Sequence, residues 1–196
     1  MALIDGEKKA IYATEGPCVV VASQEKGRAF LVARVSHLLE KGIASEGILV
    51  LFSSVLAAKA TEKDIRETTS ERKTFPRVTT FHSLSEELTG KHASLLGIKE
   101  DVRTLPPDET VKYAQRLLGT DPFLRDQYGK QARYVLAGDF NTLNASERAI
   151  VDLMGAAWRN ICVIGEPERR RTLFDARADC FDVFKAQYIN ATEIHL

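Results

Sequence analysis

Short apolar runs recur along the chain, and longer segments with helical periodicity separate them. Most of the runs are continuous in apolar residues, which is typical of strands buried on both faces of a parallel sheet. The sequence therefore predicts an α/β fold in which helices flank a parallel sheet. Strands are expected at residues 18–22, 48–52, 78–81, 133–136 and 161–164, with a last strand opening at Glu193.

Two segments show the spacing of an amphipathic helix. Residues 30–41 carry apolar side chains every three to four positions and end at Gly42, a helix stop signal. Residues 145–158 repeat the scheme after Asn144, an expected N-cap with Glu147 three residues later. Both helices are expected to pack on the sheet.

Composition places the chain among ordinary globular proteins. Its 196 residues, 44% hydrophobic and 28% charged, suit one domain spanning 1–196, with residues 84–130 as a helical insertion that lacks a strand. The 27 basic and 27 acidic residues cancel, so no overall charge attracts nucleic acid or a membrane. Three scattered cysteines (Cys18, Cys162, Cys180) predict buried, reduced thiols and no metal site.

Targeting signals are missing from the sequence as it stands. No apolar run is long enough to span a bilayer, and the N-terminal residues lack a hydrophobic signal core. We therefore expect a cytoplasmic protein with no membrane partner.

The junction between the first strand and the first helix reads ASQEKGRA, residues 22–29. Nucleotide-binding α/β proteins hold phosphates at such a junction, using the pattern G-x-x-x-x-G-K-[ST]. In one register Gly27 is kept, while Arg28 and Ala29 take the lysine and hydroxyl places. In a register shifted by one residue, Gly27 and Arg28 take those places. Both registers lose the lysine and the magnesium-binding hydroxyl, so this stretch alone favours an ordinary turn.

Three other strand ends carry polar residues. Asp139 follows the fourth strand and offers one carboxylate where magnesium-dependent nucleotide hydrolases use two, although Asp139 and Asn141 also suit a turn. Arg169 opens an arginine cluster after the fifth strand, suited to a phosphate or to a solvated, locally paired face. His82 lies in TTFHS after the third strand, where a lone histidine is usually structural.

The order of these motifs resembles one family, the N-terminal RecA-like ATP-binding domain of the UvrD/Rep/PcrA group of superfamily 1 DNA helicases. The segment TTFHS contains the family's T-F-H-S motif outright. Residues 3–17 are similar to the family's opening segment, with Glu7 where a glutamine reads adenine. Gly138 stands for the magnesium-binding aspartate, and Asp139 for the catalytic glutamate. Arg169 replaces a glutamine that senses the γ-phosphate.

The resemblance implies a RecA-like, P-loop NTPase-like fold and assigns site residues by position. Asp139 takes the catalytic place. The vestigial nucleotide site comprises Glu7, Ser23, Gln24, Glu25, Lys26, Gly27, Arg28, Ala29 and Arg169. The candidate DNA-binding residues are Ser54, Thr80, Phe81, His82 and Ser83.

Departures from the family pattern fall on functional positions, so the resemblance implies a degenerate domain that cannot hydrolyse ATP and binds neither ATP nor Mg²⁺. Such a domain would serve as a structural, DNA-binding or protein-binding module in DNA repair or replication. Its expected partners are single-stranded DNA or a protein, and the remaining helicase domains of a longer chain of which this sequence is a fragment.

Two alternatives stay open. The first is an active ATP-dependent DNA helicase domain with ATP and Mg²⁺ bound, in which Arg28 and Asp139 take the lysine and glutamate roles. The second is an unrelated flavodoxin-like or receiver-like binding module. Strand order separates the second from the helicase type, because helicase sheets insert strands between the first and second strands of the sequence.

Overall fold

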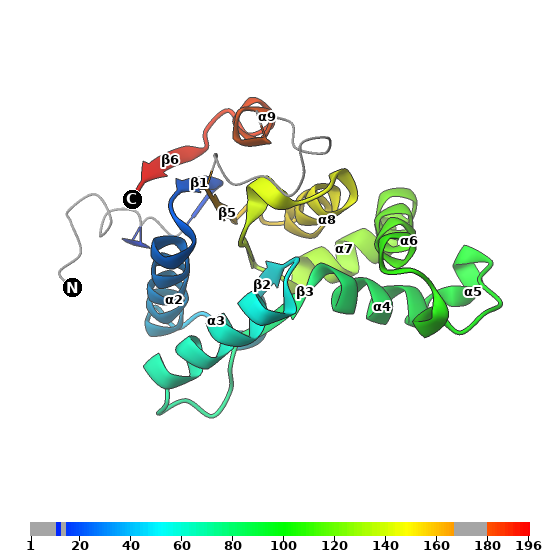
Figure 1. Cartoon of the computed structure of the whole chain (residues 1–196), viewed down its shortest axis with the longest axis horizontal. Coiled ribbons are helices and arrows are strands. Elements are labelled where there is room, and N and C mark those ends of the chain that lie inside the picture. The colour runs from blue at the N-terminus through cyan, green and yellow to red at the C-terminus, as the bar shows by residue number, and fades with distance from the viewer. Residues whose placement is uncertain (1–10, 13–14, 167–179) are drawn as a thin grey trace.

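The computed structural model describes residues 11–12, 15–166 and 180–196, and its centre is one six-stranded parallel sheet (Figure 1). The strands are β1 (Cys18–Val21), β2 (Ile48–Phe52), β3 (Arg77–Thr80), β4 (Tyr134–Ala137), β5 (Ile161–Gly165) and β6 (Thr192–His195). Every pairing in the sheet is parallel. Each predicted strand is found within one residue of its expected bounds, which confirms the α/β interpretation.

The strand order is β3-β2-β4-β5-β1-β6, so β4 and β5 lie between β1 and β2. A flavodoxin-like sheet keeps the first strand beside the second. That alternative is therefore wrong, and the order is the one expected of a RecA-like sheet.

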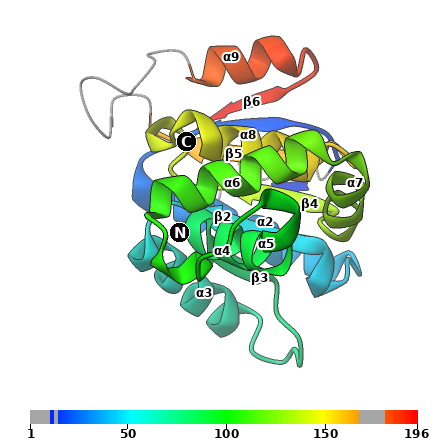
Figure 2. The same ribbon diagram turned by 90° about the vertical axis from the view of Figure 1, so that its right-hand side faces the viewer.

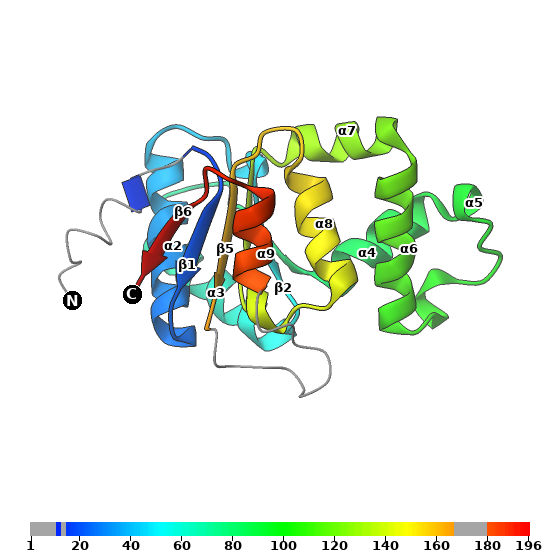
Figure 3. The same cartoon turned by 90° about the horizontal axis from the view of Figure 1, so that it is seen from above.

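Helices cover both faces of the sheet, as Figure 3 shows from above. The helices are α2 (Gln24–Glu40), α3 (Val55–Thr68), α4 (Phe81–Lys91), α5 (Ala93–Leu96), α6 (Pro107–Thr120), α7 (Pro122–Gln131), α8 (Ala145–Gly155) and α9 (Cys180–Gln187). Short 3-10 turns are η1 (Ser45–Gly47), η2 (Val102–Thr104) and η3 (Phe140–Thr142). None of the helices in the described ranges is long and apolar enough to cross a membrane.

Alternate residues along each strand feed two separate cores. Val19 and Val163 point toward the apolar faces of α4, α6, α8 and α9. Val20 and Ile164 point toward α2 and α3 on the opposite face. Burial on both faces explains why the strands appear in the sequence as unbroken apolar runs.

The helices differ in how closely they follow the sequence prediction. α8 begins at Ala145 behind a capping box, in which Asn144 Oδ1 accepts from Glu147 N at 3.0 Å and Glu147 Oε2 accepts from Asn144 N at 2.8 Å. It ends at Gly155, earlier than expected. The segment between β3 and β4 is helical and contains no strand; Figure 2 shows its helices grouped beside the sheet.

Candidate functional site

The first junction at the carboxyl edge of the sheet is shorter than the sequence predicts. α2 begins at Gln24, so only Ala22 and Ser23 connect it to β1. Ser23 is the N-cap: its Oγ accepts from Lys26 N at 3.5 Å and its carbonyl accepts from Gly27 N at 2.8 Å. The expected loop over 22–29 is therefore mostly the first turns of a helix, because Gln, Glu and Lys are good helix formers behind a serine cap.

Gly27 has a packing role in this helix. A Cβ at residue 27 would lie 2.8 Å from Ile164 Cγ2 in β5, closer than any ordinary carbon contact. Glycine thus allows α2 to approach the sheet closely at its N-terminal turn.

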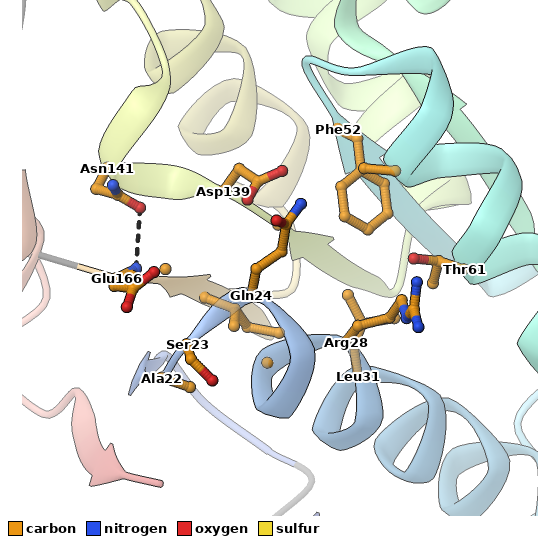
Figure 4. Close-up of a pocket in the computed structure, with 15 residues that line it drawn as sticks. Ala22, Ser23, Gln24, Arg28, Leu31, Phe52, Thr61, Asp139, Asn141 and Glu166 are labelled. Atoms are coloured by element: carbon orange, nitrogen blue, oxygen red, sulfur yellow. Dashed lines mark hydrogen bonds between the residues drawn. The ribbon is translucent and has the colours of Figure 1, made fainter. Parts of the chain in front are cut away.

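A small cavity lies beside this turn, between α2, α3 and the ends of β2, β4 and β5 (Figure 4). Its volume is about 50 Å³, the space of a few water molecules. The side chains and backbone around it belong to Ala22, Ser23, Gln24, Gly27, Arg28, Leu31, Phe52, Ala57, Thr61, Gly138, Asp139, Asn141, Ile164, Gly165 and Glu166. The structure therefore brings Ser23, Gln24, Gly27 and Arg28 together with Asp139, as the sequence predicts, although these residues are far apart in the chain.

The ring of Phe52 occupies the space beside Gly138, the residue that follows β4, in the lining of this cavity. A Cβ placed on Gly138 would lie 2.2 Å from Phe52 Cε1 and 2.7 Å from Phe52 Cδ1. The ring of Phe52, itself 5% exposed, thus rests on the backbone of residue 138. No side chain fits at this position while the ring keeps its place.

Arg28 extends from α2 toward α3 and forms an ion pair there. Its Nε lies 3.1 Å from Asp64 Oδ2, and both side chains are partly exposed. Thr61, one turn earlier on α3, is fully buried against the cavity, and its Oγ1 has no hydrogen-bond partner within the described part of the chain.

The residues after β4 form a tight turn. Asp139 has a left-handed backbone with φ of 52°, which aspartate tolerates, and its carbonyl accepts from both Thr142 N and Thr142 Oγ1 at 2.8 Å. Asn141 Oδ1 accepts from Glu166 N at 3.0 Å, the dashed line in Figure 4. Asn141 thereby joins η3 to the end of β5.

The TTFHS segment forms a second junction at the same edge, between β3 and α4. Thr80 is the N-cap of α4, and its Oγ1 accepts from Ser83 N at 3.0 Å. Phe81 is the first residue of α4 and is fully buried in the core, so the strand predicted at 78–81 ends one residue earlier, at Thr80. His82 is half-buried with no partner for Nδ1 among the described residues, and Ser83 is exposed.

The remaining predicted site residues take separate places. Ser54 caps α3, with its Oγ accepting from Ala57 N at 3.4 Å. Glu25, Lys26 and Ala29 are exposed on α2. Glu7 and Arg169 lie outside the described residues.

Three residues of this region escape sequence reasoning. Phe52 and Ile164 are the ends of apolar runs, and nothing in the sequence marks them as facing Gly138 and Gly27. Asp64 lies in a helix with many charges, so its pairing with Arg28 has no sequence signal either.

Comparison with known proteins identifies the family of this chain. The family model described as the UvrD/REP helicase N-terminal domain matches residues 3–121. The chain belongs to this family. It is also 26% identical over 105 residues to the ATP-dependent DNA helicase PcrA of two strains of Staphylococcus epidermidis. That match covers 53% of this chain and 14% of each relative, so the chain matches only a small part of their length.

Among solved structures, the Pif1 helicase from Candida albicans has a TM-score of 0.57 to this chain at 11% sequence identity. The alignment covers 100% of this chain and 39% of that protein. A likeness at this identity shows the fold alone. Together with the family match, it confirms the resemblance inferred from the motifs: a UvrD-type, helicase-like ATP-binding domain with a RecA-like sheet.

Proposed function

We propose that this chain is a UvrD-type helicase domain that has lost ATP hydrolysis and acts as a structural, DNA-binding or protein-binding module in a protein of DNA repair or replication. The observation that carries the proposal is the contact between Phe52 and Gly138. The resemblance assigns a magnesium-binding aspartate to position 138, where this chain has glycine beneath an aromatic ring.

Magnesium fits this strand end poorly. Mg²⁺ requires oxygen ligands in near-octahedral geometry, usually with one or two carboxylates. Gly138 supplies none, and the Phe52 ring lines the space beside it with carbon. Asp139 remains as a carboxylate at the cavity, but its left-handed backbone belongs to the turn that begins η3. We therefore expect no magnesium ion at this site.

A triphosphate also finds few partners at the start of α2. Backbone N–H groups of Lys26 and Gly27 already donate to Ser23, and Glu25 adds negative charge to the first turn. The guanidinium of Arg28 pairs with Asp64 on α3. Each lost stabiliser of transferring phosphate typically costs a few kcal/mol of barrier, so several together leave hydrolysis negligible.

Titration calorimetry of the purified chain with ATP and MgCl₂ tests the proposal. The expected result is no saturable heat up to millimolar ATP, and no phosphate release. An active UvrD-type helicase measured in parallel is the positive control. Micromolar ATP affinity accompanied by turnover would overturn the proposal.

One observation favours the active alternative: Arg28 and Asp139 both line the cavity, as that alternative requires. Arg28→Ala and Asp139→Ala in the full-length protein would then each abolish ATPase activity. Asp64→Ala is the matched control, because it removes the ion pair of Arg28 and leaves the guanidinium in place. An ATPase rate that both alanine variants leave unchanged rules this alternative out.

A nucleic-acid role rests on the β3–α4 junction. Ser83 is exposed and His82 is half-buried there, whereas Thr80 and Phe81 are buried. Since the sequence carries no net charge, binding to single-stranded DNA would depend on local contacts and remain weak. Fluorescence anisotropy with a labelled oligothymidine tests this role: His82→Ala should weaken binding, and Ser94→Ala on α5 should not. Equal binding by both variants would favour a protein partner.

A further inference from the structure

Two cysteines face each other inside the sheet. Cys18 opens β1, and the register of the β1–β5 pair sets it directly opposite Cys162. Side chains of directly paired residues in parallel strands project from the same face of the sheet. Both thiols lie in the core beneath α2, with Cys18 4% and Cys162 2% exposed. The sheet therefore holds two reduced thiols side by side although they lie far apart in the chain.

Interactions around the pair make the two sulfurs unequal. The two thiols interact with each other, and the positive charge of the buried Arg34 on α2 acts on both. The neighbouring Cys18 thiol and the charge of Arg34 lower the pKa of Cys162, against the opposing effect of burial. The same contact with Cys162, together with burial, raises the pKa of Cys18. Cys162 is thus the sulfur better suited to react as a thiolate, and Cys18 is its neighbour.

The geometry points to a reversible oxidation site in which Cys18 and Cys162 close to an intrachain disulfide when a hydroperoxide is present. Adjacent strands lie about 4.8 Å apart, which is within the Cα separation of about 4.4–6.8 Å found across disulfides. The spacing of two paired strands is therefore one that a disulfide can bridge. This inference is independent of whether the cavity at the other end of the strands binds a nucleotide.

The reaction balances with a hydroperoxide as the only co-reactant. Cys162 releases its thiol proton, the thiolate attacks one peroxide oxygen, and the O–O bond breaks; Cys162 becomes a sulfenic acid, and the departing hydroxide or alkoxide takes up the released proton and leaves as water or an alcohol. The Cys18 sulfur then attacks the Cys162 sulfur, the S–O bond breaks, and the hydroxyl departs as water with the proton of Cys18. Both sulfurs are oxidised by one electron, and the peroxide takes up the two electrons.

The third cysteine supplies a matched control. Cys180 begins α9 and is buried in the core on the opposite face of the sheet, 6% exposed. Burial raises the pKa of its thiol. A similar degree of burial without a neighbouring thiol should leave Cys180 unchanged by the same treatment. Comparing Cys180 with the Cys18–Cys162 pair therefore distinguishes the effect of a neighbouring thiol from the effect of oxidant access to a buried cysteine.

A link between the two strands also affects the neighbouring site. β1 and β5 end at the cavity, where Ala22 N donates to Gly165 O at 3.0 Å. A disulfide closing so long a loop restricts the unfolded chain and should raise the melting temperature by roughly 5–10 °C. Dithiothreitol should reverse the shift.

The test treats the fully reduced protein with hydrogen peroxide and follows its mass. We expect a loss of about 2 Da, because a disulfide lacks two hydrogens. Digestion by trypsin without reductant should yield residues 10–26 linked to residues 160–169. Cys180→Ser should oxidise like the natural sequence. Cys18→Ala should lose the link and leave a sulfenic acid at Cys162, trapped by dimedone.

Any result other than a disulfide between Cys18 and Cys162 of one chain argues against a reversible oxidation site there. An unchanged mass, under conditions that fully oxidise glutathione, would overturn the proposal, as would a disulfide involving Cys180 or a link between two chains. Circular dichroism of each variant checks that it folds. The measurements on the unsubstituted protein decide the matter even if a cysteine variant does not fold.

Discussion

Two strand-to-helix junctions at the same edge of the sheet differ in how well their sequences match the family pattern. At β3–α4 the family motif is intact, and Thr80 caps the helix through Ser83 N. At β1–α2 the motif is altered, the helix starts early at Gln24, and Gly27 packs on Ile164. The first junction keeps residues that the backbone needs. At the second, Gly27 packs on Ile164 and neither register supplies the lysine and hydroxyl of a phosphate loop, a contrast that agrees with the proposed loss of ATP hydrolysis.

The largest expected effect comes from removing the ring of Phe52, which packs against the backbone of Gly138. Phe52→Ala removes a buried ring and should lower the free energy of unfolding by about 3–5 kcal/mol in urea denaturation. Gly138→Ala forces the ring to move and should cost about 1–3 kcal/mol. In the double variant the new methyl group enters the vacated space, so the two losses should fall short of additive by at least about 1 kcal/mol. Strict additivity would show that the ring does not occupy the place of a side chain at residue 138.

The next effect tests the close approach of α2 to β5. Gly27→Ala should lower the free energy of unfolding by about 1–2 kcal/mol, because the clash with Ile164 exceeds the gain in helix propensity. Gly90→Ala on α4 is the matched control: a Cβ there meets nothing within 4 Å, so the protein should gain up to about 1 kcal/mol. Equal effects at the two glycines in urea denaturation would contradict the packing role of Gly27.

A smaller effect is expected at the intact junction. Thr80→Ala removes the N-cap of α4 and should cost about 1 kcal/mol in thermal unfolding. Thr80→Ser retains the acceptor oxygen and should cost less than half of that. If both variants melt alike, the cap does not contribute to stability.

The smallest effect concerns the ion pairs that hold α4 beside β3. Glu87 on α4 interacts with Lys91 at 2.6 Å and with Arg77 of β3, and the hydrogen bond from Lys91 lowers the pKa of Glu87. A lowered carboxyl pKa stabilises the fold above the unfolded value and loses that contribution as pH falls through the folded value. Because these side chains are partly exposed, the contribution should be about 0.5 kcal/mol.

Urea denaturation at pH 7 and pH 3 measures this difference. Glu87→Gln should cost about 0.5 kcal/mol at pH 7 and less at pH 3, because the contribution of the charge is lost as pH falls through the lowered pKa of Glu87. Glu86→Gln, next to it on α4, provides the control. A cost that does not change with pH would show that the charge of Glu87 is irrelevant.

Sequence patterns recover the sheet well because each strand is buried on both faces and therefore continuously apolar, as ILVLF at β2 illustrates. The capping box at Asn144 is equally predictable, since all its partners are local. The start of α2 is not, because the glycine at position 27 suggests a loop unless Ile164 is known to lie against it. Contacts across long sequence separations, such as Phe52 with Gly138, have no local signal.

The place of β1 in the sheet has a consequence for how the chain is made. Among the described strands, β1 pairs with β5 and β6, both of which are translated long after it, and Leu196 N donates to Val21 O at 3.0 Å. The apolar residues 18–21 therefore emerge from the ribosome well before either partner exists. Such distant pairings slow folding and leave a bare strand open to aggregation in the meantime. During translation β1 consequently benefits from shielding until β5 and β6 have been made.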